Sequence, residues 1–265
     1  VASADSACYL SALIVTFVTV TFVSWFTQPE KDYRMSIRII TDSASDIEQG
    51  EYQNVDVLPM TITIDEEEFC DGIDITKDEF YHRLETSEVI PATSLISPFQ
   101  FGEVYDSIQA AGDEAIVITM SSKLSGTYQS AKTAAEGRPY VSVIDSMQVT
   151  AAQKLLVLRA MQLVLLGLSR KEIVEELERE KERIVIYAAV DTLDYLLKGG
   201  RISKTSALMG GFIGIKPILT LQDGELIPIG KARGSKKSHA FLNQKIQEVG
   251  GIDFSMPYAV GYSGT

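Results

Sequence analysis

From residue 37 onward, short apolar runs alternate with stretches whose apolar residues recur at helical spacing. The runs are IRII (37–40), AIVITM (115–120) and YVSVID (140–145). Each reads as a buried strand, and the second and third runs are each followed by a helix. Pro98 opens a further helix with apolar residues at 101, 104, 105 and 108. Such alternation is typical of a parallel sheet covered on both faces. We therefore expect an α/β domain over residues 35–168.

Local signals add detail to this pattern. The segment 55–69 (VDVLPMTITIDEEEF) predicts a strand followed by a second extended segment. Thr76 with Glu79, and Ser169 with Glu172, have the spacing of capping boxes at helix starts. A long helix is expected around residues 149–166.

The pattern changes in the last third of the chain. IVIYAAV (184–190) predicts a strand and 191–200 a short helix, and Asp223-Gly224 lies between two apolar runs as in a hairpin. Hairpins in place of crossovers predict a second, antiparallel α+β domain over residues 169–265. No internal repeat or low-complexity linker separates the two domains, so we expect them to pack closely.

The first 34 residues do not fit this scheme. Residues 6–28 carry no charge and are about long enough to span a bilayer. They read as a membrane anchor with Lys31 and Arg34 on the cytoplasmic side, as a signal peptide, or as sequence foreign to the native protein. We favour the last interpretation, with Met35 as the start, because a domain beginning there needs nothing upstream.

Composition narrows the function classes. The chain has 265 residues, 45% of them hydrophobic, and a net charge of −12, which disfavours nucleic acid and anionic membrane surfaces as partners. Two cysteines and two histidines exclude a disulfide framework and give no zinc-site spacing. No metal or cofactor is expected, and a cytoplasmic location fits this cysteine usage.

The stretch SSKLSGTYQSA (121–131) raises the question of chemistry, because it follows a buried strand and opens a helix. It lacks the Gly-x-Ser-x-Gly pattern of a lipase elbow, and the chain has no glycine-rich nucleotide loop. A serine hydroxyl, free backbone N–H groups and the positive end of a helix dipole favour an anionic ligand. The alternative is that Ser125 or Thr127 simply caps the helix.

A second polar loop, PATSLISP (91–98), also precedes a helix. In a parallel sheet, such loops gather at the carboxyl ends of the strands. We therefore expect Thr93 and Ser94 to face Ser125 across one crevice. Hydroxyls and N–H groups without a nearby base fit recognition of a carboxylate or phosphate better than catalysis.

Seven motifs in order give the chain a resemblance to the DegV family of bacterial fatty-acid-binding proteins. They are TDSASD, PATSLISP, LSGTYQSA, VIDS, LLKGGRIS, IKPIL and GKARG. The resemblance implies a long-chain fatty acid whose carboxylate is held by Thr93 and Ser125, with Ser94 and Gly126 beside them. It also implies an apolar tunnel between the domains for the acyl tail.

The family resemblance has further implications for partners. The resemblance implies that a partner kinase subunit phosphorylates the presented acid, so that the carrier itself is not an enzyme and needs no nucleotide. Arg201 and Arg233 match family arginines near the head group and the kinase-facing surface, although each could be an ordinary solvated arginine.

The sequence departs from the family in three places. Leu95-Ile96 replaces the usual Gln-Pro of the Thr-Ser-Gln-Pro-Ser loop, and the apolar N-terminal segment is foreign to the pattern. The given sequence ends at AVGYSGT, within an expected strand and before the family's final segment with its head-group histidine. On this comparison we expect a truncated second domain and an incomplete tunnel.

Two other functions stay open from the residues. One is a serine hydrolase acting on acyl esters with Ser125 as nucleophile, which would need a positioned base. His82 and His239 read as surface residues, and Asp42 and Asp145 as braces for loops. The other is a sugar- or phosphate-binding α/β domain, which would need no apolar tunnel.

Overall fold

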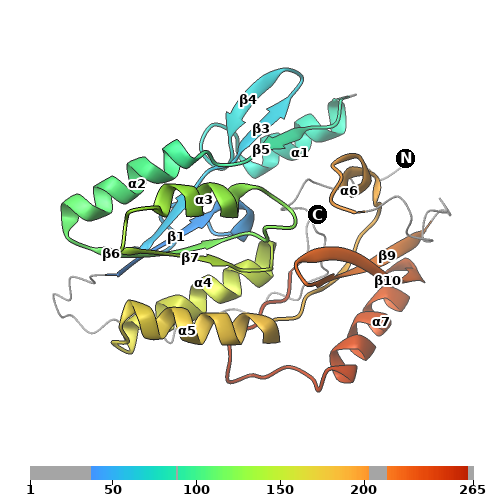
Figure 1. The fold of residues 1–265 in the computed structure, drawn as a ribbon. Helices are drawn as coiled ribbons and strands as arrows, with labels where there is room; N and C mark the ends of the chain where they lie inside the picture. The colour runs from blue at the N-terminus through green and yellow to red at the C-terminus, as the bar shows by residue number, and fades with distance from the viewer. Residues whose placement is uncertain (1–36, 88, 203–213, 262–265) are drawn as a thin grey trace.

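The computed structural model describes residues 37–87, 89–202 and 214–261 (Figure 1). Its central feature is a parallel sheet with strand order β2-β1-β6-β7. The strands are β1 (Ile37–Asp42), β2 (Val55–Leu58), β6 (Glu114–Thr119) and β7 (Val141–Asp145). The parallel sheet predicted from the alternating runs is confirmed.

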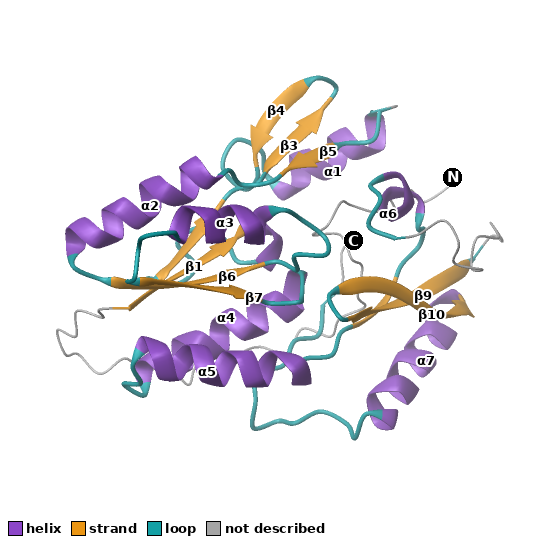
Figure 2. Ribbon diagram, in the orientation of Figure 1, coloured by secondary structure: helices purple, strands orange, loops and turns teal. Residues whose placement is uncertain are grey.

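Helices cover both faces of this sheet (Figure 2). On one side lie α2 (Pro98–Ala111) and α3 (Thr127–Ala135), and on the other α4 (Thr150–Leu165) and α5 (Arg170–Glu180). The predicted boundary between residues 168 and 169 stays a prediction. Helix α5 follows that boundary in sequence and packs against β6 and β7.

A small antiparallel sheet, β4-β3-β5, lies beside α1 (Lys77–Thr86) at the top of Figure 1. Its strands are β3 (Thr61–Ile64), β4 (Glu67–Cys70) and β5 (Ala92–Ser94). The second extended segment is thus a β3–β4 hairpin that turns at Asp65 and Glu66. Both residues have positive φ values, of 49° and 69°.

The PATSLISP segment (91–98), which was expected to be a loop, is in part a strand. Its first half forms β5, which pairs antiparallel with β3 and places Thr93 opposite Ile62. The segment lies between α1 and α2 in sequence, so no strand of the parallel sheet precedes it directly. Backbone pairing with β3, which the polar sequence did not signal, fixes its position.

The capping predictions are confirmed to different extents. At α5, Ser169 and Glu172 form the reciprocal capping box. At α1, the Thr76 hydroxyl accepts from the Glu79 amide at 3.2 Å, but the Glu79 carboxylate pairs with Arg83. The prediction therefore locates the start of α1 correctly, but only the Thr76 hydrogen bond of the expected capping box is present.

The last third of the chain forms the predicted antiparallel α+β unit. Its sheet has the order β10-β9-β8, built from β8 (Tyr187–Ala189), β9 (Ile215–Gln222) and β10 (Glu225–Arg233). The β9–β10 hairpin turns at Asp223 and Gly224, both at positive φ. Helix α7 (Gly234–Glu248) packs against this sheet, and α6 (Asp194–Lys198) lies between β8 and β9 in sequence. Two 3-10 turns lie at Ser43–Ser45 and Lys181–Arg183.

Two expectations concern the ends of the chain. Of the segment AVGYSGT (259–265), which was expected to lie within a strand, residues 259–261 belong to no strand, and residues 262–265 lie outside the described residues. Residues 1–34, with the apolar run 6–28, lie outside the described residues. Within the described ranges, no helix combines the length and the apolar character needed to cross a bilayer.

Candidate functional site

A cavity of about 310 Å³ lies where the small antiparallel sheet meets the start of α3. The residues that line it are Met60, Thr93, Ser94, Leu95, Ser125, Gly126 and Arg201. Five of the six predicted site residues therefore surround one space, although they come from three separate stretches of the chain. Arg233 is not among them.

The first wall of the cavity comes from the end of β5 and the residue before β3. Pairing of β5 with β3 sets Ser94 opposite Thr61 and Thr93 opposite Ile62. Met60 is buried, and its amide donates to the Ser43 hydroxyl at 3.1 Å. Strand pairing thus holds the two predicted hydroxyl residues next to a buried thioether.

The second wall is the turn that leads from β6 into α3. The amides of Leu124 and Ser125 donate to the Ser121 carbonyl at 3.0 and 3.1 Å. The Ser125 and Thr127 hydroxyl oxygens lie 2.9 Å apart, and the Thr127 amide donates to Ser125 Oγ at 3.3 Å. The Ser125 hydroxyl is therefore oriented by the helix start that it partly caps.

Gly126 occupies the N-cap position of α3 and supplies no side-chain cap. The first amides of a helix have no partner inside the helix, and the helix dipole places partial positive charge there. Because Gly126 lines the cavity, this end of α3 favours an anionic group in the same space. Both features predicted for an anion site, hydroxyls and a helix start, thus occur together.

Arg201, which follows α6 in sequence, forms the third part of the cavity wall. Its Nε donates to the Leu124 carbonyl at 3.1 Å, and its Nη1 donates to the Gly199 carbonyl. Two backbone carbonyls thereby hold the guanidinium near the turn that carries Ser125. The permanent positive charge adds to the preference of the cavity for an anion.

Arg233 lies elsewhere, at the end of β10 where α7 begins. Its side chain is exposed, as are those of Lys231, Lys236 and Lys237. The segment between Glu225 and Glu248 contains no acidic residue. Arg233 therefore belongs to an exposed basic stretch and not to the cavity wall.

The two strand-ending aspartates brace loops, as predicted. Asp42 accepts from the amides of Met120 and Ala44 at 2.7 and 3.2 Å, and burial raises its pKa to about 6. Asp145 accepts from the amides of Ser122 and Met147 at 3.1 and 3.0 Å. These bonds fix the carboxyl ends of β1, β6 and β7.

The geometry does not support a hydrolase. The Ser125 hydroxyl pairs with Thr127, while His82 and His239 are exposed on α1 and α7. Neither histidine shares a hydrogen bond with Ser125 among the bonds of the described residues. The described residues also contain no group of histidine, cysteine and acidic side chains arranged to hold a metal ion.

Sequence reasoning missed two residues of the cavity wall. Leu95 stood out only as a departure from a family pattern, and Met60 gave no signal within an apolar strand segment. Leu95 is 46% exposed, whereas the next residue, Ile96, is buried in the hydrophobic core. A side-chain alternation of this kind becomes visible only once the path of the backbone is known.

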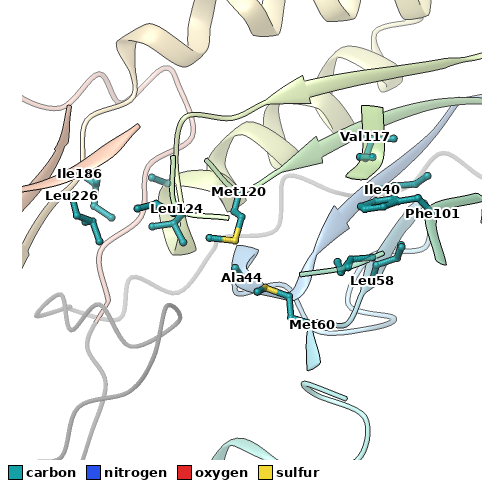
Figure 3. Close-up of a cluster of buried hydrophobic side chains, with 14 of the residues drawn as sticks. Ile40, Ala44, Leu58, Met60, Phe101, Val117, Met120, Leu124, Ile186 and Leu226 are labelled. Atoms are coloured by element: carbon teal, nitrogen blue, oxygen red, sulfur yellow. The ribbon is translucent and has the colours of Figure 1, made fainter. Parts of the chain in front are cut away.

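A hydrophobic cluster continues from Met60 into the molecule, and we call it the interdomain cluster. It contains Met60, Ala44, Met120, Leu124, Ile40, Phe101, Ile186, Leu219 and Leu226, among others. Figure 3 shows Met120 and Leu124 between the residues of the parallel sheet and Ile186 and Leu226. Apolar side chains thus join the cavity wall to both large sheets.

Comparison with known proteins identifies the family. The model of the DegV family, described as "Uncharacterised protein, DegV family", matches residues 36–260. A DegV domain-containing protein of Caldanaerobacter subterraneus is 40% identical over 223 residues, which cover 83% of this chain and 79% of the relative.

Two solved structures have the same fold. A fatty-acid-binding DegV family protein from Thermus thermophilus has a TM-score of 0.74 and 33% identity, with 80% of this chain and 77% of that chain covered. The fatty acid kinase B3 protein of Streptococcus pneumoniae, loaded with linoleic acid, has a TM-score of 0.71 and 26% identity, with coverages of 81% and 79%. The chain described here belongs to the DegV family.

Proposed function

We propose that this protein binds a long-chain fatty acid, with the carboxylate held by Thr93 and Ser125 beside Ser94 and Gly126. The observation that carries the proposal is that these residues and Arg201 line one cavity at the start of a helix. Hydroxyls, amides at a helix start and a guanidinium are donors suited to a carboxylate. The fatty acids bound by the two solved relatives support this choice of ligand.

The acyl tail enters the interdomain cluster through the side of the cavity formed by Met60. Met60 belongs both to the cavity wall and to the cluster, so a chain anchored at Ser125 would meet apolar surface beyond it. Methionine side chains are flexible and adapt to irregular apolar shapes. Each buried methylene group contributes about 0.8 kcal/mol, so the tail supplies most of the affinity.

The second part of the proposal is that the bound acid is presented to a partner kinase in the cytoplasm, and that this chain performs no catalysis itself. The name of the pneumococcal relative, a fatty acid kinase subunit, supports a kinase partner. The exposed basic stretch around Arg233 is suited to an acidic or phosphate-bearing partner surface. Arg201, next to the carboxylate, is suited to the acyl phosphate product.

The test is native mass spectrometry of the full chain purified without added lipid, followed by binding measurements. We expect co-purified fatty acid, and tighter binding of hexadecanoic acid than of hexadecan-1-ol, which has the same tail without the carboxylate. A fluorophosphonate probe should leave Ser125 unlabelled. Stoichiometric labelling of Ser125 would favour the hydrolase, and absence of saturable fatty acid binding would refute the carrier.

A further inference from the structure

Ser121 lies outside the cavity wall but makes the hydrogen bonds that shape the turn carrying Ser125. It is fully buried, and its amide donates to the Gln148 carbonyl at 2.8 Å. Its carbonyl accepts from the amides of Leu124 and Ser125. The position of the Ser125 hydroxyl therefore depends on the position of Ser121.

The Ser121 hydroxyl connects this turn to the antiparallel α+β unit. It donates to the Gly224 carbonyl at 2.7 Å and accepts from the Lys123 amide at 3.2 Å. Gly224 is at the tip of the β9–β10 hairpin, more than one hundred residues away in sequence. A single hydroxyl group thus bridges the hairpin tip and the turn before α3.

The hairpin tip fits closely against the turn. Gly224 has a φ of +79°, and a Cβ atom there would lie 2.5 Å from Ser121 Oγ and 3.2 Å from Met147 Cε. The approach requires glycine both for the backbone conformation and for space. This contact between segments distant in sequence leaves no room for a side chain.

Two further hydrogen bonds join the same regions. Arg201 Nε donates to the Leu124 carbonyl at 3.1 Å, inside the turn itself. Gln148, whose carbonyl receives the Ser121 amide, donates from Nε2 to the Ile184 carbonyl at 3.1 Å. The turn is therefore held on several sides by the part of the chain that follows α5.

We infer that Ser121 is a positioning residue that couples the β9–β10 hairpin to the carboxylate site. The inference rests on the proposed fatty acid function and adds a residue that touches no ligand. Without its hydroxyl, the buried Gly224 carbonyl and the Lys123 amide lose their shared partner, and the turn samples other conformations. Apparent affinity then falls in proportion to the fraction of molecules with a binding-competent turn.

The experiment compares an acid and an alcohol of equal chain length on the full-length protein. Ser121→Ala should weaken hexadecanoic acid binding by roughly five- to thirty-fold and change hexadecan-1-ol binding by less than about two-fold. The matched control is Ser122→Ala, because Ser122 is exposed and its hydrogen bond to Asp145 is made by its amide, which the substitution keeps. That variant should bind both ligands like the wild type.

A second variant approaches the same contact from the hairpin. Gly224→Ala places a methyl group against Ser121 Oγ, and it should reproduce the selective loss of acid binding. In the double variant Ser121→Ala/Gly224→Ala the clash with Oγ is gone, so the two losses should combine to less than their sum. If Ser121→Ala fails to fold, Gly224→Ala tests the inference alone. A selective loss of acid binding supports the positioning role, and equal losses for acid and alcohol overturn it.

The outcomes separate the inference from the function on which it rests. If the wild type binds the alcohol as tightly as the acid, the carboxylate site itself is refuted. If the wild type prefers the acid and Ser121→Ala keeps the same preference, only the positioning role is refuted. Equal losses for acid and alcohol would mean general damage to packing and would also overturn the inference.

Discussion

The side chain of Leu95 lies against Gly126 so closely that a Cβ atom at residue 126 would stand 2.8 Å from Leu95 Cδ2. The two residues come from different walls of the cavity, one before α2 and the other before α3. Gly126 has a φ of −73°, so alanine is compatible with its backbone, but its Cβ atom would require the Leu95 side chain to move. Leu95 is therefore the side chain that an alanine at residue 126 would displace.

This contact predicts a compensated pair of substitutions. Gly126→Ala should displace Leu95 and weaken fatty acid binding by about ten-fold, because the cavity wall must shift. Adding Leu95→Ala should restore most of the affinity. Isothermal titration with hexadecanoic acid measures both effects.

The control for this pair is Gly102→Ala on α2. A Cβ atom there would have Arg138 Nη2 at 3.9 Å as its nearest neighbour, which is ordinary contact. We expect unchanged binding in this variant. An affinity loss in Gly126→Ala that persists in the double variant would show that Leu95 is not the cause.

Removing either anchoring hydroxyl should weaken acid binding without abolishing it. Thr93→Ala or Ser125→Ala deletes a hydrogen bond to a charged group, which costs about 1.5 to 3 kcal/mol, or roughly ten- to hundred-fold in affinity. Burial of the tail does not depend on either hydroxyl, so binding should remain measurable. The amount of co-purified acid and direct titration provide two readouts.

Ser107→Ala is the matched control, since the Ser107 hydroxyl donates to the Val104 carbonyl within α2. Its affinity should equal that of the wild type. Wild-type affinity in both Thr93→Ala and Ser125→Ala would place the carboxylate somewhere else.

Charge reversal should distinguish the role of Arg201 in acid binding from the role of Arg233 in contact with the kinase. Arg201→Glu puts a carboxylate in the cavity wall and should weaken both acid binding and acyl phosphate formation. Arg233→Glu lies on the exposed basic stretch and should leave binding within about two-fold while slowing phosphorylation by a reconstituted fatty acid kinase. Unchanged turnover with Arg233→Glu would remove that residue from the partner surface.

The raised pKa of Asp46 should make the stability of the protein depend on pH. Burial raises the pKa of Asp46 to about 7 from 3.8, against the opposing charges of Lys77 and Lys154. The native state then binds more protons than the unfolded chain between about pH 4 and pH 7, so the unfolding free energy falls as pH rises through this window. Asp42, with a pKa of about 6, contributes in the same direction.

Asp46→Asn should remove the Asp46 part of this fall, and urea denaturation at several pH values measures it. Asparagine tolerates the left-handed conformation of residue 46, whose φ is 56°. Asp223→Asn is the control, because Asp223 is exposed and has a φ of 50°. Parallel stability curves for wild type and Asp46→Asn would contradict the raised pKa.

The fold could be predicted from the sequence wherever a local pattern decides the structure. The apolar runs gave the strands of the parallel sheet, Ser169 and Glu172 gave the start of α5, and Asp223-Gly224 gave the hairpin. The β3–β4 turn was not predicted because Asp65-Glu66 is not a usual hairpin pair. Strand β5 was not predicted because three residues of mostly polar sequence are too short to show a periodic pattern.

The site shows the same division. Ser125 could be proposed from the residues because a hydroxyl at a helix start has a chemical meaning without further context, whereas Gly126 was proposed from the family resemblance. The contacts of Leu95 with Gly126 and of Ser121 with Gly224 join residues that are 31 and 103 positions apart. Such contacts depend on the final packing of the chain, so no local sequence pattern could predict them.

The interdomain cluster has a consequence for cooperativity. Ile40 and Phe101 share it with Ile186, Leu219 and Leu226, so neither large sheet can separate from the other without exposing apolar surface on both. Calorimetry should therefore show a single melting transition for the two units. Any opening wide enough to admit an acyl chain must cross a free-energy barrier set by these shared contacts, which makes ligand exchange slow compared with side-chain motion.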